Sequence, residues 1–485
     1  MSLEIQSLGP WLFLACGILG TLLVSVVRPS TKRPAQISAL LTLLGTAILA
    51  VRGLGSDSLV AMSGTFEISQ LTHGFLAAVC GLGILFILGT GHYLTRERIH
   101  LSDYYHLLLV LILGASILVA SKHLVVTFIA LEVMSLAAYT LAGFRRNDSR
   151  SNEAAIKYFI LGGAMAAVYL LGVSFVFGAT GSMQLGAIYE WSKSSSSGHD
   201  LFRFGHLMLV LSFLFKVAAA PLHFWKPDVY EGAPTPVTGI MASVITSAAF
   251  LTLIRLVHLV DFGASDWVSH GDLMKGVLRV SAAASLIVGS MIMITQKNLK
   301  RMLAYSSITH SGYLLLGALG TFSPALEISS MLIYLGGYAV MSTGVFVLLT
   351  VSCAQADTGV ELIDLTGLMK RAPFLTLLWI VFLLSMAGMP FTVGFFTKYF
   401  VFIASLGSNE VGLVILAAIC TVVGAYAYLR PIALMTMRDA APGASDWRPT
   451  LGSQMVVVTA AAAVLVLGIA PNPVIHFLKG ISLIH

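Results

Sequence analysis

The sequence predicts an all-α polytopic membrane protein with about fourteen transmembrane helices. Of its 485 residues, 57% are hydrophobic and only 10% are charged, whereas an ordinary soluble domain has about 25% charged residues. Apolar stretches of about 20 residues, the length of a membrane-spanning helix, recur along the whole chain. The longest polar stretch, the Ser-rich segment from Trp191 to Asp200, is too short for a soluble domain. Residues 1–485 are therefore expected to form one transmembrane domain.

The expected helices divide the chain into four parts. Hydropathy places their centres near residues 18, 44, 81, 112, 132, 166, 213, 247, 284, 309, 340, 388, 421 and 461. Residues 1–100 hold three helices, 101–262 hold helices four to eight, 263–435 hold helices nine to thirteen, and 436–485 hold the last. The first stretch lacks a basic segment and a small-residue cleavage site, so it is expected to be a retained helix.

Residues 101–262 and 263–435 are expected to be two inverted five-helix repeats. EAAIKYFILGG, which begins at Glu153, resembles EISSMLIYLGG, which begins at Glu327, and FLFKVAAAP from Phe213 resembles FLLSMAGMP from Phe382. The two offsets, 174 and 169 residues, nearly agree. Chance similarity in sequence rich in Leu, Gly and Ala is the alternative. An odd number of helices between equivalent positions inverts the second unit, as in many transporters.

Prolines inside helices seven and twelve predict that both helices are broken. Pro221 and Pro390 each lie within an apolar stretch, where a proline removes one backbone hydrogen bond and clashes with the preceding turn. Such breaks are tolerated at membrane depth where they face protein or a water-filled cavity. Lys216 lies five residues before Pro221, and Lys398 lies eight residues after Pro390. Each break therefore has one lysine nearby.

Three ionisable residues within apolar stretches predict a proton-handling function: Glu132, Lys216 and Lys398. A charged side chain at the bilayer centre costs roughly 2.5 to 3.5 kcal/mol on insertion scales, so such residues mark ion or proton pathways. A partner charge that approaches or withdraws can load or release a proton on a buried group. Glu132 is expected to be the counter-ion of Lys216 if helices five and seven pack together. The alternative for each lysine is a kink needed only for packing, with the amine reaching outward.

Secondary relay candidates lie near the breaks and on helices six, eight and ten: Glu153, Lys157, His223, Thr246 and His310. Glu153 and Lys157 share a helix face at i, i+4 spacing and form either a surface pair or a proton uptake site. A histidine titrates near neutral pH and can relay protons, although His310 could equally be a structural hydrogen-bonding group. Thr246 could order water between helices or simply make a packing contact.

The distribution of basic residues predicts the orientation in the membrane. The net charge is +6, but the loops on one side hold sixteen Lys and Arg residues, Lys226 among them, against seven on the other side. The positive-inside rule then places both termini outside. Asp228 and Glu231, which follow Lys226, are expected in a solvated loop.

The chain carries no sign of a redox or nucleotide site. Cys16, Cys80, Cys353 and Cys420 lie far apart in apolar stretches without a CxxC pattern, whereas an iron-sulfur cluster needs several converging thiolates. The sequence also has no GxGxxG turn after a strand and no Walker loop. We therefore expect no cofactor and no metal on this chain.

Four segments carry a family resemblance: FKVAAAPLHFWKPDVYEGAPTPVT, KNLKRMLAYSSITHSGYLLLG, AGMPFTVGFFTKYFVF and EAAIKYFILGGAMAAVYLLGVSFVFGATGSM. Together they resemble the subunit N (subunit 2) family of bacterial proton-pumping NADH:quinone oxidoreductase, respiratory complex I. The resemblance extends from about helix three to helix fourteen. It implies that Glu132, Lys216 and Lys398 form the proton path, and that Lys157 and His223 match further family positions.

One position departs from the family pattern. Many members carry a lysine on helix eight where this chain has Thr246. Water held by Thr246 and neighbouring hydroxyls, His258 or His310 could take over that role, or the coupling could be altered in this lineage.

The resemblance also implies where the redox chemistry takes place. NAD, FMN, the iron-sulfur clusters and the quinone, such as ubiquinone, are expected in other subunits of an electron transport complex in the cell inner membrane. Expected partners are other antiporter-like and small helical membrane subunits, and no nucleic acid. The alternatives are a subunit of a multisubunit sodium/proton antiporter, a subunit of a membrane-bound hydrogenase, and a scaffold that moves no protons.

Overall fold

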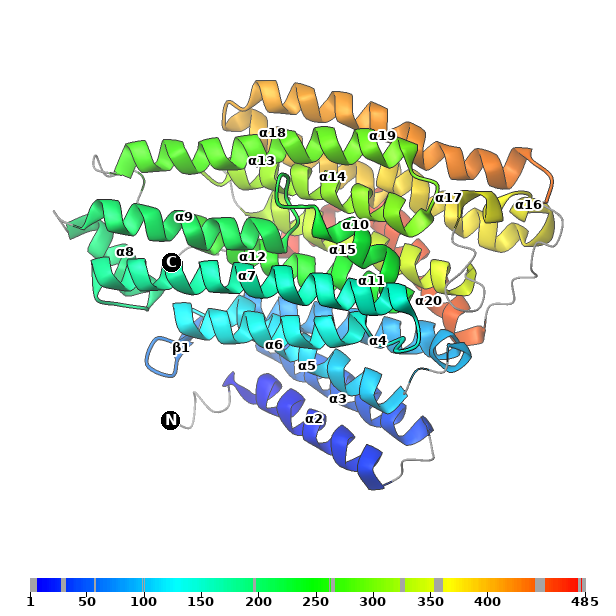
Figure 1. Ribbon diagram of the computed structural model, residues 1–485, viewed down its shortest axis with the longest axis horizontal. Coiled ribbons are helices and arrows are strands. Elements are labelled where there is room, and N and C mark those ends of the chain that lie inside the picture. The colour runs from blue at the N-terminus through cyan, green and yellow to red at the C-terminus, as the bar shows by residue number, and fades with distance from the viewer. Residues whose placement is uncertain are drawn as a thin grey trace.

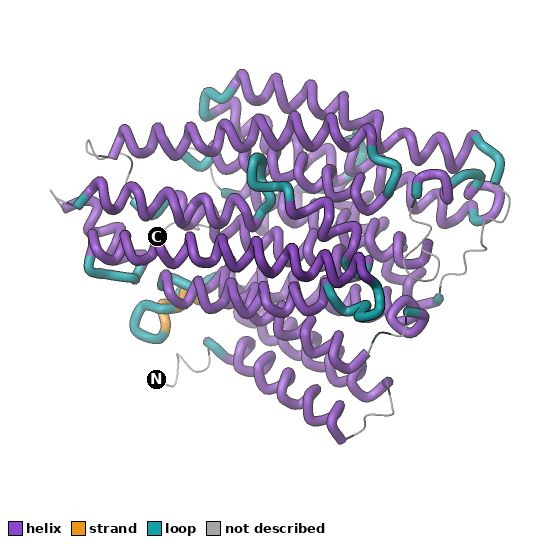
Figure 2. The backbone as a smooth tube through the Cα atoms, viewed as in Figure 1, coloured by secondary structure: helices purple, strands orange, loops and turns teal. Residues whose placement is uncertain are grey.

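Helices that lie side by side make up nearly the whole molecule (Figures 1 and 2). The structure, a computed structural model, describes every residue except 1–6, 28–31, 56–57, 98, 100, 195–197, 261, 263–266, 323–327, 353–360, 441–449, 479–480 and 482–485. The helix ends gather at two opposite faces of the bundle. We call the face at which α2 (Gly9–Val27) begins the N-terminal face, and the other the opposite face.

The predicted all-α membrane fold is confirmed. Among the described residues, eleven helices are long and apolar enough to span a membrane. They are α2, α3 (Lys32–Gly53), α4 (Gln70–Arg96), α5 (Leu101–Ala120), α6 (Leu124–Ala142), α7 (Ser149–Thr180), the continuous helix α11 (Thr235–Ile240), η1 (Met241–Ile245) and α12 (Thr246–Val257), α13 (Val268–Thr295), α15 (Ser329–Ser352), α19 (Val411–Met437) and α20 (Leu451–Ile469). Helix α14 (Leu299–Gly320) and two broken helices bring the total among the described residues to the predicted fourteen.

Helices seven and twelve are broken as the prolines predict. Helix seven consists of α9 (His199–Lys216) and α10 (Trp225–Gly232), and helix twelve consists of α17 (Pro373–Ala387) and α18 (Val393–Gly407). Ala218 in the first break has a φ of 54°, and Gly388 in the second has a φ of 89°. Backbone in this left-handed region favours glycine. A Cβ at Gly388 would also lie 3.0 Å from the Lys398 side chain, so this glycine lets the break and the lysine approach each other.

The two expected repeats are visible in the order of the helices. The first unit comprises α5, α6, α7, α9 with α10, and α11 to α12, and the second comprises α13, α14, α15, α17 with α18, and α19. The fourth helix is the broken one in both units. Because each unit has five helices, the first begins at the opposite face and the second at the N-terminal face, which makes them inverted. Glu327, used above to detect the repeat, lies outside the described residues.

The helix from Thr235 to Val257 occupies the centre of the bundle. All its residues are buried, and it packs against α5 and α9 of the first unit and against α15 of the second. Just before Thr246 it contains one π-helical turn, η1, a feature frequent at functional sites. This helix therefore lies between the two units and packs directly against α9 of the first break.

A small β-hairpin at the N-terminal face was not predicted. Strands β1 (Leu59–Ala61) and β2 (Phe66–Ile68) pair antiparallel between α3 and α4. Glu67 on β2 is buried and accepts a hydrogen bond from Arg255 at the end of α12, at 3.1 Å. Arg255 also donates to the carbonyls of Val119 and Ser121. A two-stranded hairpin is marginal alone, so these contacts hold it on the bundle.

Two segments expected to be loops are partly helical. The Ser-rich segment overlaps the end of α8 (Leu185–Ser194) and the start of α9. The rings of Trp191 and Phe202 pack together at 5.3 Å between these two helices. The segment with Asp228 and Glu231 is helix α10 rather than a solvated loop. The remaining short elements are η4 (Leu362–Leu365), α16 (Leu368–Arg371) and α21 (Asn472–Leu478).

Candidate functional site

Lys216, the last residue of α9, turns its amine into the bundle. The residue is 6% exposed, and its Nζ donates to Ser135 Oγ at 2.6 Å. The same amine lies 5.4 Å from the ring centroid of Tyr139 and 5.1 Å from that of Tyr158. Ring faces attract a cation, so the hydroxyl and the two rings form a polar niche at the first break. The amine does not reach outward to the surface.

Glu132 lies on α6, one helical turn before Ser135. Because Ser135 accepts the hydrogen bond from the Lys216 amine, Glu132 lies about one helical turn from that contact. Within the described part of the chain the two side chains form no direct ion pair; the Lys216 amine donates to Ser135 instead. The structure thus brings the two predicted residues together between α6 and α9. Their joint role in proton transfer stays a prediction.

Lys398 on α18 is held by the second break. It is 7% exposed, and its Nζ donates to the carbonyls of Met386 at 3.1 Å and Ala387 at 2.9 Å. These are the last carbonyls of α17, which have no partner within their own helix and carry the negative end of the helix dipole. The break therefore supplies the acceptors for this amine, which also lies 5.0 Å from the ring of Tyr313.

His310 on α14 is surrounded by tyrosines. It is 1% exposed, and its Nδ1 shares a hydrogen bond of 2.7 Å with the hydroxyl of Tyr334. Its ring lies 4.7 Å from that of Tyr338 and 6.0 Å from that of Tyr313. Because Tyr313 is also the ring beside the Lys398 amine, His310 and Lys398 belong to one cluster.

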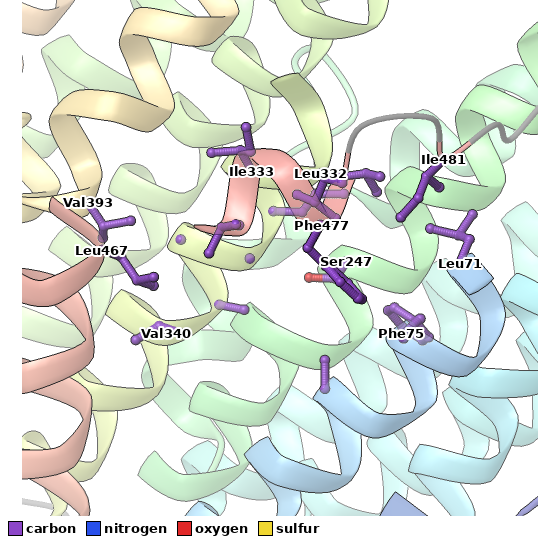
Figure 3. A pocket seen from close by; sticks show the side chains of 18 of the residues that line it. Leu71, Phe75, Ser247, Leu332, Ile333, Val340, Val393, Leu467, Phe477 and Ile481 are labelled. Carbon is purple, nitrogen blue, oxygen red and sulfur yellow. The ribbon is translucent and has the colours of Figure 1, made fainter. Parts of the chain in front are cut away.

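Thr246 has a different environment from the lysines. It is buried, and its hydroxyl donates to the carbonyl of Met241 at 3.0 Å, within its own helix. The next residue, Ser247, borders an apolar cavity of about 320 Å³ between α4, α15, α18 and the C-terminal helices. Figure 3 shows Ser247 among carbon side chains such as Leu71, Phe75 and Phe477. The described contacts of Thr246 do not join it to Lys216, His310 or Lys398.

Glu153 and Lys157 belong to a larger charged network near the opposite face. Lys157 Nζ lies 2.7 Å from Glu153 Oε1 and 2.8 Å from Asp228 Oδ2 on α10. Arg301 on α14 in turn contacts Asp228 and Glu231, each at 2.8 Å. The pair predicted on one helix face thus joins three elements.

His223 lies in the first break, just before α10. It is partly buried, and its carbonyl accepts a hydrogen bond from the backbone N–H of Lys226 at 3.0 Å. This contact forms the turn with which α10 begins. A role of the imidazole as a relay stays a prediction.

Lys226 is a buried amine that sequence reasoning missed. It was counted among the loop charges, but it lies on α10 with 2% of its surface exposed. Its Nζ lies 5.3 Å from the ring of Tyr230, one turn further along the helix. The apolar and aromatic residues around it, Trp225 and Tyr230, were the available signal that this segment enters the core. Lys226 thus joins Lys216, His310 and Lys398 as a buried basic group near the two breaks.

The described residues contain no group of three or more His, Cys, Asp or Glu side chains that could hold a metal ion. Cys16, Cys80 and Cys420 are free thiols, and Cys353 lies outside the described residues. The amines, imidazole, carboxylates and hydroxyls described above can exchange protons.

Comparisons with known proteins decide the family. The family model described as NADH:quinone oxidoreductase/Mrp antiporter, TM, matches residues 121–425. The chain belongs to this family. NADH-quinone oxidoreductase subunit N 1 of Sorangium cellulosum is 38% identical over 448 residues, which cover 88% of each chain. That of Solibacter usitatus is 34% identical, over 95% of this chain and 94% of the relative. The family membership that the motifs implied is confirmed.

Solved structures show the same architecture. A chain of respiratory complex I from Thermus thermophilus, determined with bound aureothin, has a TM-score of 0.81 and 29% identity, with 96% of this chain and 98% of that chain covered. A chain of the Mrp complex from Dietzia sp. has a TM-score of 0.82 but only 18% identity, with 98% and 96% covered. The second likeness concerns the fold alone. The complex I structure and the family model together show that the chain matches an antiporter-like membrane subunit.

Proposed function

We propose that this chain is a proton-translocating, antiporter-like membrane subunit of NADH:quinone oxidoreductase. The observation that carries the proposal is the set of buried amines at the two helix breaks, in a chain whose relatives bear the name subunit N of that enzyme. Electron transfer from NADH to quinone takes place in other subunits, which hold NAD, FMN, iron-sulfur clusters and quinone. This subunit converts the released energy into movement of a proton.

The geometry supports a relay that runs across the bundle. Glu132 and Lys216 lie at the first break, and Lys398 at the second, with His310 beside it. A carboxylate that moves relative to Lys216 changes the preference of that amine for its charged form. The freed carbonyls of α17 stabilise the ammonium form of Lys398. Moving one charge against 100 mV costs about 2.3 kcal/mol, so the relay needs energy from the redox subunits.

The proposed setting is the cell inner membrane, with both termini outside. The N-terminal face would then be outside and the charged network of Lys157, Asp228 and Arg301 inside, where protons are taken up. Other antiporter-like subunits and small helical subunits of complex I are the proposed partners. Two other functions remain in competition: a subunit of a multisubunit sodium/proton antiporter or membrane-bound hydrogenase, and a scaffold without proton transfer. The identity of 33–38% to relatives named subunit N favours the complex I role.

Replacement of Lys216 tests the proposal. In the complete complex reconstituted into vesicles, we expect Lys216→Ala to reduce severely the protons moved per NADH oxidised, while the complex still assembles. A buried amine is costly to the fold, so its removal should not unfold the bundle.

The matched control is Lys193→Ala, which removes an exposed lysine of α8. This variant should pump normally. A normal proton yield from the Lys216→Ala complex would overturn the proposal and leave the scaffold role.

A further inference from the structure

We propose that Lys226 carries the proton between the Lys216 and Lys398 regions, in place of the helix-eight lysine that this chain lacks. The inference rests on the proposed function, because it needs a relay in which to act. Thr246 stands where many family members have the helix-eight lysine. Its hydroxyl donates within its own helix, and the next residue, Ser247, borders an apolar cavity. Another basic group is therefore needed between the two breaks.

Aromatic rings connect Lys226 to the first break. The preceding residue, Trp225, stacks on Tyr158 with a centroid distance of 4.7 Å and an interplanar angle of 7°. Tyr158 is one of the two rings beside the Lys216 amine, at 5.1 Å. A single stacked pair thus lies between the backbone of Lys226 and the Lys216 niche. This packing fixes the position of α10 relative to the first break.

Packing of α10 connects Lys226 to the second break. Helix α10 packs against α14, which carries His310, and Arg301 of α14 contacts Asp228 of α10 at 2.8 Å. His310 is buried and lies beside the ring of Tyr313, which also faces the Lys398 amine. The helix of Lys226 thus contacts the helix whose histidine belongs to the Lys398 cluster.

The burial of Lys226 has no evident structural purpose. The described residues provide no carboxylate within ion-pair distance of its amine, which faces the ring of Tyr230 at 5.3 Å. Lys300 is a contrasting case, since its buried amine donates to the carbonyl of Ala233 and so ties α14 to the end of α10. A buried ammonium without a counter-ion is costly, and an apolar residue of similar length would pack as well. A group that must gain and lose a proton explains the lysine.

The proposed transfer changes only N–H bonds. The Lys226 ammonium gives one proton to His310, directly or through water, and becomes a neutral amine while the imidazole becomes an imidazolium. His310 then passes that proton to the neutral Lys398 amine. Like charges repel strongly at low dielectric constant, so a proton that arrives at one group favours the departure of the proton from the next. The neutral Lys226 amine regains a proton from the Lys216 ammonium. Repulsion between neighbours thus couples each transfer to the next, while the energy supplied by the redox subunits sets the direction.

A charged network near the opposite face includes α10, the helix that carries Lys226. Asp228 lies two residues further on α10 and contacts Lys157 and Arg301. Lys157 also contacts Glu153, whose side chain is 62% exposed. The network therefore reaches from the surface to the helix that carries Lys226.

Two substitutions separate transfer from a purely structural charge. Lys226→Met removes the amine, and Lys226→Arg keeps a positive charge that does not deprotonate in proteins. In vesicles with the complete complex, we expect both variants to lower the protons moved per NADH to the level of Lys216→Ala, with assembly retained. If the lysine were only a structural cation, the Arg variant would pump normally, and that result would overturn the inference. Lys275→Met is the matched control, since Lys275 lies over the ring of Phe322, away from the row.

A second-site variant tests the replacement itself. Lys226→Met combined with Thr246→Lys should regain at least half of the lost proton yield, because it returns an amine to the central helix. No recovery in an assembled complex would overturn the inference that Lys226 replaces the helix-eight lysine. If the Lys216→Ala complex moves far fewer protons per NADH while the Lys226→Met complex moves the normal number, this inference fails and the proposed function stands. A normal yield from Lys216→Ala would instead overturn the proposed function.

Discussion

The buried amines of Lys216, Lys226 and Lys398 each lie beside a tyrosine ring. Lys216 faces Tyr139 and Tyr158, Lys226 faces Tyr230, and Lys398 faces Tyr313. A cation–π contact contributes about 0.5 to 2 kcal/mol to the charged form, whereas breaking a buried ion pair costs about 3 to 5 kcal/mol. The rings therefore stabilise each ammonium enough to hold it inside the bundle but do not fix its charge. Side chains of this kind suit a relay better than salt bridges do.

Glu132 is the exception, because it brings a negative charge to the row. We expect Glu132→Gln to lower the protons moved per NADH several-fold but less than Lys216→Ala does, since Lys216 keeps its hydrogen bond to Ser135. At an effective dielectric constant of about 20, two unit charges about 10 Å apart still interact by roughly 1.7 kcal/mol. Glu190→Gln is the control, because that carboxylate is 71% exposed on α8. A proton yield equal to that of the unaltered complex would remove Glu132 from the mechanism.

At the scale of elements, breaks in regular helices create the site. The break after α17 leaves two carbonyls free for Lys398, and the break after α9 ends the helix at Lys216. The segment that follows the first break becomes helical again and carries Lys226 back into the core. Backbone irregularity at membrane depth is tolerated because it lies inside protein. The same irregularity supplies polar groups that a regular apolar helix would lack.

The β-hairpin stabilises one end of the central helix, and its contact with Arg255 can be tested. Arg255→Met should destabilise the protein by about 3 to 5 kcal/mol, because it leaves the buried Glu67 with Lys122 alone, at 3.3 Å. The thermal midpoint of the purified complex reports the loss. Adding Glu67→Gln to Arg255→Met should recover part of the lost thermal stability, because the buried carboxylate that lost its partner is then neutral.

The exposed pair of Lys370 and Asp439 provides the control for that experiment. Their side chains are 74% and 86% exposed, and a surface ion pair contributes little to stability. Lys370→Met should therefore leave the midpoint nearly unchanged. An equal effect of Arg255→Met and Lys370→Met would mean that the hairpin contact does not stabilise the bundle.

At the scale of the whole molecule, the sequence predicts what depends on local pattern. Hydropathy and the interior prolines Pro221 and Pro390 predict the number of helices and both breaks, because each signal lies within about 20 residues. The environment of Lys226 was missed because it depends on how α10 packs against α7 and α14, which are far apart in the chain. The hairpin was missed because its three-residue strands are held by Arg255, 188 residues from Glu67. Thr246 was noticed through the family pattern, but only packing shows that its hydroxyl stays within its own helix.

The orientation of the whole bundle is the remaining prediction, and surface labelling can decide it. If the termini are outside, α8 at the N-terminal face is outside and α16 at the opposite face is inside. In a background with Cys16, Cys80, Cys353 and Cys420 replaced by Ser, Lys193→Cys should react with a membrane-impermeant maleimide in intact cells. Lys370→Cys should react only in inverted vesicles. Both positions are accessible, with side chains 42% and 74% exposed, so a missing reaction reports the side of the membrane. The reverse pattern would place the termini inside and direct proton uptake to the N-terminal face, away from the charged network of Lys157 and Asp228.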